Sequence, residues 1–218
     1  LTLTVNGVAA TSLPNDGSST ITATVTAVDT NRNVVADIPV TVSVDADATA
    51  AVSGTATDDL GVVTAAIGVG SNRSNRTVTI TAISGGLVRA ASFEVTGANL
   101  TGTPLPAVIA PSAAGKVDFA LKDCNGTAMA GQTIVVSGTD GSSLTGTTDA
   151  NGKYSYGYTA PASAGSLNIS ATAGGVTQTV GVLVQASGST SIPPATVTVQ
   201  SASVSASPSV VQVNTAST

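Results

Sequence analysis

The stretch from residue 147 to 159, TTDANGKYSYGYT, constrains the fold most, because a polar turn leads there directly into a strict two-residue alternation. Asn151 and Gly152 tolerate the positive backbone dihedral angles of a tight turn. In an extended strand successive side chains point to opposite faces, so the alternation puts Tyr154, Tyr156 and Tyr158 on one face. The stretch therefore predicts a turn followed by a half-buried β-strand.

A weaker copy of this pattern lies upstream at residues 57–67, TDDLGVVTAAI. Gly61 and Gly152 are 91 residues apart (152 minus 61), and the double glycines that begin at Gly85 and Gly174 are 89 residues apart (174 minus 85). Two independent landmarks thus give nearly the same offset. The sequence predicts two copies of one module.

Alternating apolar and polar residues recur along the rest of the chain, separated by Gly, Pro, Asn and Asp turns. About seven such strands fall within a hundred residues, the density of a β-sandwich, and no helix of useful length is predicted. The sequence predicts an all-β chain with sandwiches over residues 1–97 and 98–188, joined by a breaker-rich linker at 97–104. Residues 189–218 are predicted to be the first strand of a further repeat or an extended connector. Residues predicted to face inward are Ile21, Ala23, Val25, Ala27, Ile38, Val40, Val42, Val44, Val63, Ala65, Ile67, Val117, Phe119 and Leu121.

Composition excludes several classes of protein. The net charge is -5 and no cluster of Lys and Arg occurs beyond Arg73 and Arg76, which argues against nucleic acid as a partner. Polar residues interrupt every apolar run well short of the roughly 18 residues that a membrane-spanning helix needs, so no membrane-embedded segment is predicted. Cys124 is the only cysteine, so no disulfide can form within the chain.

The turn at Asp149 to Gly152, the alternation after it, the double glycine at 174 and the loop from Asp123 to Gly126 resemble bacterial immunoglobulin-like domains of group 1. These domains are the repeats of invasin- and intimin-type surface adhesins. The resemblance extends over both modules and the start of a third. It implies tandem immunoglobulin-like β-sandwiches without disulfides that serve as a rigid extracellular link on a bacterial surface, while ligands are bound by domains of another type.

Catalysis is hard to support, because histidine is absent and Glu94 and Cys124 are each the only residue of their kind. No enzyme activity and no cofactor are predicted. Aspartates in predicted turns raise calcium binding as an alternative, but the twelve-residue calcium loop is absent and Asp is favoured in turns for capping amides. These residues are Asp45, Asp47, Asp58, Asp59 and Asp149.

Three hypotheses for function follow. The first is a non-catalytic stalk, whose partners are the neighbouring repeats of the same chain. The second is a subunit of a self-assembling fibre, whose uncharged C-terminal segment adds a strand to another copy of the chain. The third is a carbohydrate-binding module in which Tyr154, Tyr156 and Tyr158 stack on sugars, although the phase of the first module favours a core role for the tyrosines. The segment for strand addition comprises Thr196, Val197, Thr198, Val199, Val210, Val211 and Val213.

Overall fold

The computed structural model describes residues 2–6, 11–138 and 142–186. These residues form β-strands and the turns between them, and the described ranges contain no helix, so the all-β prediction is confirmed. No helix long and apolar enough to cross a membrane is therefore found in them. Cys124 is a free, exposed thiol, and no disulfide contributes to the fold.

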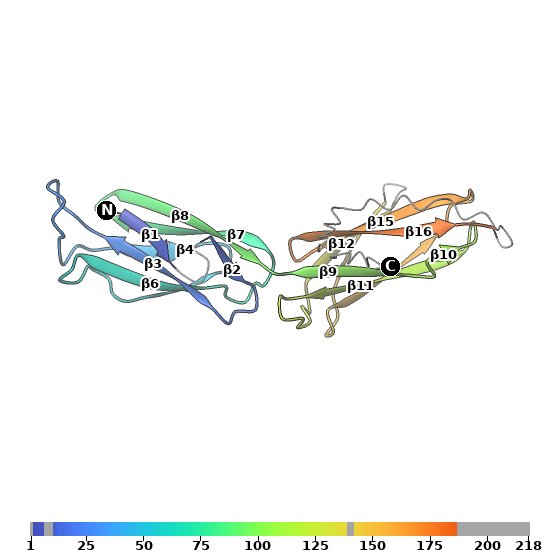
Figure 1. Cartoon of the computed structure of the whole chain (residues 1–218), viewed down its shortest axis with the longest axis horizontal. Helices are drawn as coiled ribbons and strands as arrows, with labels where there is room; N and C mark the ends of the chain where they lie inside the picture. Colours follow the sequence, from blue (N-terminus) through green and yellow to red (C-terminus); the bar gives the residue numbers. More distant parts are fainter. Residues whose placement is uncertain (1, 7–10, 139–141, 187–218) are drawn as a thin grey trace, which may run out of the picture. The chain divides into compact units, whose positions relative to one another are not determined.

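The first eight strands form two four-stranded sheets (Figure 1), with the orders β1-β3-β6-β5 and β2-β8-β7-β4. All neighbours in them are antiparallel except β2 and β8. The alternation of Thr with small apolar residues produces these strands, because one face of each sheet is buried and the other meets water. The strands are β1 (Thr2–Asn6), β2 (Ser12–Pro14), β3 (Thr20–Thr26), β4 (Thr41–Val44), β5 (Thr49–Val52), β6 (Val62–Gly68), β7 (Arg76–Ser84) and β8 (Leu87–Thr96).

The next eight strands form a three-stranded sheet, β14-β11-β9, and a five-stranded sheet, β10-β16-β15-β12-β13. Here only β10 and β16 are parallel. The strands are β9 (Asn99–Leu105), β10 (Val108–Ile109), β11 (Ala114–Lys122), β12 (Thr133–Ser137), β13 (Ser143–Thr147), β14 (Lys153–Thr159), β15 (Gly165–Ala173) and β16 (Val176–Val184).

Each set of strands encloses its own hydrophobic core. The first core contains Phe93 and small aliphatic side chains from both sheets, and the second is built around Phe119 and Leu121. The predicted inward residues are buried, except for Ile38 and Val44, which are half-buried. The domain boundaries at 97/98 and 188/189 stay predictions.

The predicted repeat extends to individual hydrogen bonds. Four aspartates begin turns of the same form, in which Oδ1 accepts from the backbone N–H groups two and four residues later, at 2.8 to 3.0 Å. The third residue after each aspartate has a positive φ, between 68° and 80°. Three of these positions are glycine and one is Arg32. The four aspartates are Asp29, Asp58, Asp123 and Asp149.

Buried threonines provide a second shared detail. The Thr57 hydroxyl donates to the carbonyl of Val35 and accepts from the amide of Ile38. Thr148, 91 residues later (148 minus 57), donates to the carbonyl of Met129 and accepts from the amide of Gln132. Each sandwich thus contains a buried threonine whose hydroxyl bonds one backbone carbonyl and one backbone amide. A buried hydroxyl is tolerated there because both its donor and its acceptor functions are satisfied.

One prediction about local structure was wrong, and one strand was not predicted. The linker expected at residues 97–104 is mostly strand β9, which pairs with β11. Leu100 is buried, and Gly102 leaves room for the Val180 and Phe119 side chains, so the glycine that read as a breaker serves packing instead. Strand β5, in which no inward-facing residue was predicted from the sequence, pairs with β6. Its Ala-rich sequence has weak intrinsic β-propensity.

Candidate functional site

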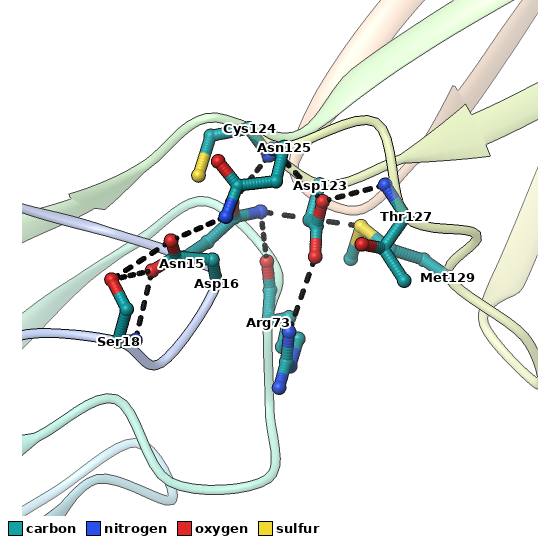
Figure 2. Close-up of polar contacts among 9 residues, drawn as sticks. All are labelled: Asn15, Asp16, Ser18, Arg73, Asp123, Cys124, Asn125, Thr127 and Met129. Atoms are coloured by element: carbon teal, nitrogen blue, oxygen red, sulfur yellow. Dashed lines mark hydrogen bonds and ion pairs between the residues drawn. The ribbon is translucent and has the colours of Figure 1, made fainter.

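Asn15, which follows β2, lies at the centre of a network of contacts between the two sandwiches (Figure 2). Its side chain is fully buried. Nδ2 donates to the Arg73 carbonyl at 2.7 Å, and Oδ1 accepts from the Cys124 amide at 3.0 Å. Nδ2 also points at the Met129 sulfur, 4.0 Å away. One amide group therefore joins two loops of the first sandwich to the turn after β11 in the second.

Asp123 forms the ionic part of this junction. Its Oδ2 lies 3.1 Å from Nη1 of Arg73, while its Oδ1 caps its own turn. The Asp123 side chain is 2% exposed and that of Arg73 is 42% exposed. A buried carboxylate is tolerated only when a charge and hydrogen bonds compensate it, and Asp123 has both.

Two further polar contacts lie around Asn15 and Asp123. Nδ2 of Asn125 donates to Oδ2 of Asp16 at 2.7 Å, and the Ser74 hydroxyl donates to Oε1 of Gln132 at 3.2 Å. The pKa of Asp16 is held below its usual value, first by hydrogen bonds from Ser18 and then by the contact with Asn125 and the charge of Arg73. Asp16 therefore stays ionised and available as an acceptor at neutral pH.

Close backbone approaches complete the junction. The Asn75 amide donates to the Gly174 carbonyl at 2.8 Å, and its Oδ1 accepts from the Ala98 amide at 2.9 Å. A Cβ on Gly175 would lie 2.2 Å from the Asn75 carbonyl oxygen, and one on Gly97 would lie 2.6 Å from Cβ of Cys124. Both glycines also have positive φ. The junction thus depends on glycine at two positions where the sandwiches meet.

The sequence marked Gly175 as part of a repeated double glycine and Gly97 as part of a breaker-rich linker, but it did not predict the junction. Arg73 was singled out only for its proximity to Arg76, and Asn15 was not singled out. The partners of Asn15 and Arg73 in the second sandwich are 109 and 50 residues away along the chain. No local pattern reports such a pairing, so the sequence carried no signal for it.

The tyrosines of β14 lie against the second core. All three are half-buried and pack on that core. The ring of Tyr154 covers Gly146 of β13, and Tyr156 and Tyr158 line a cavity of about 460 Å³ with Leu167 and Ile169. The Tyr158 hydroxyl is buried without a hydrogen-bond partner among the described residues, and burial raises its pKa. This position favours the core role, while sugar stacking stays an untested prediction.

The strand-addition segment, Thr196 to Val199 with Val210, Val211 and Val213, lies outside the described residues. Four of the five aspartates considered for calcium accept hydrogen bonds from protein groups. Asp58 and Asp149 cap turns, Asp45 accepts from the Thr79 amide, and Asp47 accepts from the Asn72 side chain. In the part of the chain that the structure describes, no group of three or more His, Cys, Asp or Glu side chains is arranged to hold a metal ion.

No family model and no curated protein matches the sequence. Solved structures do match the fold. The adhesin InvE of Yersinia pseudotuberculosis is 20% identical, with a TM-score of 0.54, over 84% of this chain and 58% of that one. The two sandwiches have the bacterial immunoglobulin-like fold of adhesin repeats. This confirms, at the level of fold, the resemblance seen in the sequence.

Other solved structures resemble the immunoglobulin-like pair more loosely. Invasin, a bacterial integrin-binding protein, is 22% identical over 85% of this chain and 40% of that one, with a TM-score of 0.41. Domains 5–6 of the S-layer protein SbsC are 22% identical over 86% of this chain and 98% of that one, with a TM-score of 0.33. The present chain thus spans little more than half of the InvE structure and less than half of invasin.

Proposed function

We propose that the chain is a pair of stalk repeats from an adhesin-like protein on the surface of a bacterium, and that it has no catalytic role. The observation that carries this proposal is the buried Asn15, whose side chain binds both sandwiches at once. The fold of the chain, which is similar to that of the adhesin InvE, supports this assignment. In this proposal residues 1–97 and 98–188 are the two repeats, and residues 189–218 lead into the next.

A stalk must transmit position from one repeat to the next, and the junction has the parts for this. Only Gly97 and Ala98 separate β8 from β9, and the Ala98 amide is fixed by Asn75. Arg73 and Asp123 add an ion pair beside this short connection. With so little slack and several side contacts, each sandwich constrains the orientation of its neighbour.

The experiment that tests the proposal compares the tumbling of the two sandwiches by ¹⁵N relaxation in the whole chain. A rigid junction gives both sandwiches one common rotational correlation time. In Asn15→Ala we expect two different correlation times, because the contacts from Asn15 to both sides are lost. Independent tumbling in the unaltered chain would contradict the stalk proposal.

Asn168→Ala is the matched control, because Asn168 is an exposed asparagine on β15 that takes no part in the junction. It should keep the common correlation time. A chemical-shift map should show that the core resonances of both sandwiches are retained in Asn15→Ala, so that loss of coupling is separated from loss of the fold.

A further inference from the structure

The two sandwiches differ in one strand, and the difference leaves an open sheet edge. In the first sandwich β5 pairs with β6. In the second, β13 pairs with β12 of the opposite sheet, and β14, the counterpart of β6, has β11 as its only partner among the described strands. Among the residues that the structure describes, the position beside β14 that corresponds to β5 is therefore unoccupied in the second sandwich.

The register shows which backbone groups are free. The Leu121 amide donates to the Gly152 carbonyl, and the Ala160 amide donates to the Ala113 carbonyl. Along an antiparallel pair, residues that hydrogen-bond to the partner strand alternate with residues whose amides and carbonyls point away from it. The tyrosines of β14 thus bond to β11, while Ser155, Gly157 and Thr159 direct their amides and carbonyls outward. Their counterparts in β6, 91 residues earlier, are Thr64, Ala66 and Gly68, whose outer edge is covered by β5 and by Ser53.

No contact among the described residues explains why residue 157 is a glycine. It lies in the middle of a strand, its φ is not in the left-handed region, and a Cβ placed on it would meet nothing within 4 Å. A glycine within a strand weakens it and often marks a place where another backbone approaches closely. The glycine at the centre of the free edge fits such an approach.

The cavity of about 460 Å³ lies beside this edge, between the two sheets. Tyr156 and Tyr158 form one wall, and Leu167 and Ile169 form the opposite wall. In the first sandwich Ala50 of β5 packs on the core at the corresponding place. A strand added to β14 would direct alternate side chains into this cavity, which is how sheet-edge sites combine backbone bonding with side-chain selection.

We propose that the outer edge of β14 and its cavity form an acceptor site for an extended strand, and that the occupant is Thr196–Val199 of a second copy of this chain. The sequence TVTV matches the TAAV of β5 in having Thr first and Val last, with an apolar residue second. Val197 and Val199 would face the cavity, and Thr196 and Thr198 would face solvent. Residues 189–218 carry no charge that would have to be buried.

A second folded sandwich fits this place less well than a single extended segment. The Tyr154 ring packs on Gly146, so β13 of the opposite sheet already flanks the space beside β14. Pairing two β14 edges would bring two such flanking strands together. This favours an extended segment that is not part of a folded sheet as the occupant. The proposed acceptor site is an addition to the stalk function.

The test is light scattering during size-exclusion chromatography of the full chain over a wide range of concentrations. We expect the mass to rise above that of a monomer as concentration increases. Gly157→Pro removes an outward N–H without touching the β11 ladder, and a double variant with Val197→Lys and Val199→Lys removes the apolar residues of the donor. Both should stay monomeric. Ser155→Lys replaces Gly157→Pro if the proline variant loses its circular dichroism spectrum.

Mixing gives the sharpest outcome. The edge variant keeps its donor and the donor variant keeps its edge, so the mixture should form dimers and nothing longer. Thr172→Lys is the control for an added lysine. It places the charge at an exposed position of β15, a strand paired on both sides, and should associate like the unaltered chain. The proposal is overturned by a chain that is monomeric throughout, by association that survives in either blocked variant, or by hydrogen-exchange protection of residues 196–199 in a monomer.

Discussion

Asp123 and Asp29 hold turns of the same form 94 residues apart (123 minus 29), yet only the Asp123 carboxylate also binds a guanidinium. Oδ1 of each aspartate accepts two backbone amides. Oδ2 of Asp29 accepts from the Asn33 side chain, whereas Oδ2 of Asp123 pairs with Arg73 of the other sandwich. The Asp29 turn therefore makes only local hydrogen bonds, whereas the Asp123 turn also contacts the other sandwich.

We predict that Asp123→Ala lowers the free energy of unfolding by about 2 kcal/mol, because two partly buried amides and the Arg73 guanidinium lose their acceptor. Asp29→Ala, at an exposed turn, should lower it by less. Chemical denaturation of both variants and of Asp123→Asn measures the difference. Equal losses for Asp29→Ala and Asp123→Ala would show that the contact with Arg73 adds nothing.

Glycines of the two double-glycine hairpins should respond differently to a methyl group. Gly86 and Gly175 both have positive φ, 83° and 74°, but a Cβ on Gly86 meets nothing within 4 Å while one on Gly175 meets the Asn75 carbonyl at 2.2 Å. Gly86→Ala should cost about 1 kcal/mol from backbone strain alone. Gly175→Ala should cost about 3 kcal/mol through the added clash.

Thermal unfolding of the two glycine variants measures these costs, and ¹⁵N relaxation shows whether Gly175→Ala also uncouples the sandwiches. The control is internal, since both changes add the same methyl group to the second glycine of a hairpin. A Gly175→Ala protein as stable as Gly86→Ala would refute the close approach to Asn75.

Acid should remove a stabilising contribution of Asp29. Its pKa is lowered, first by the hydrogen bond from the Asn33 side chain and then by backbone amides. A group with a lowered folded pKa stabilises the fold at pH values above its unfolded pKa, about 3.9, and loses this contribution as the pH falls through the folded value. The stability gap between the unaltered chain and Asp29→Asn should therefore close in acid, as measured by denaturation at several pH values. A gap that is independent of pH would contradict this prediction.

Tyr156→Ala should lower the free energy of unfolding by about 3 kcal/mol, because the ring packs on the second core beside Leu167. An unchanged melting temperature would contradict the core role. Tyrosine fluorescence during titration with a broad panel of glycans separates this role from sugar stacking, since only stacking changes the emission on addition of a glycan.

The sequence could predict the strands because their alternation is a local property. Ile21, Ala23 and Val25 are fully buried on β3, as their spacing predicts. Gly85 and Gly174 were predicted as turns for an equally local reason, since a two-residue hairpin turn of this type needs positive φ.

What the sequence could not supply depends on residues far apart. β9 was taken for a linker because its Gly102 and Pro104 read as breakers, and only the packing of Val180 against Gly102 explains the glycine. The placement of β13 on β12 instead of β14 was likewise hidden, because its residues alternate equally well in either sheet. Choosing between two partner strands is a tertiary decision.

The two-residue connection through Gly97 and Ala98 has a mechanical consequence. If a pulling force broke the contacts of Asn15 and Arg73, the chain released between β8 and β9 would have a contour length of only about 7 Å. The protein would therefore lengthen very little before a sandwich itself had to unravel. Under load, the junction between the sandwiches can therefore extend only by this short, fixed length.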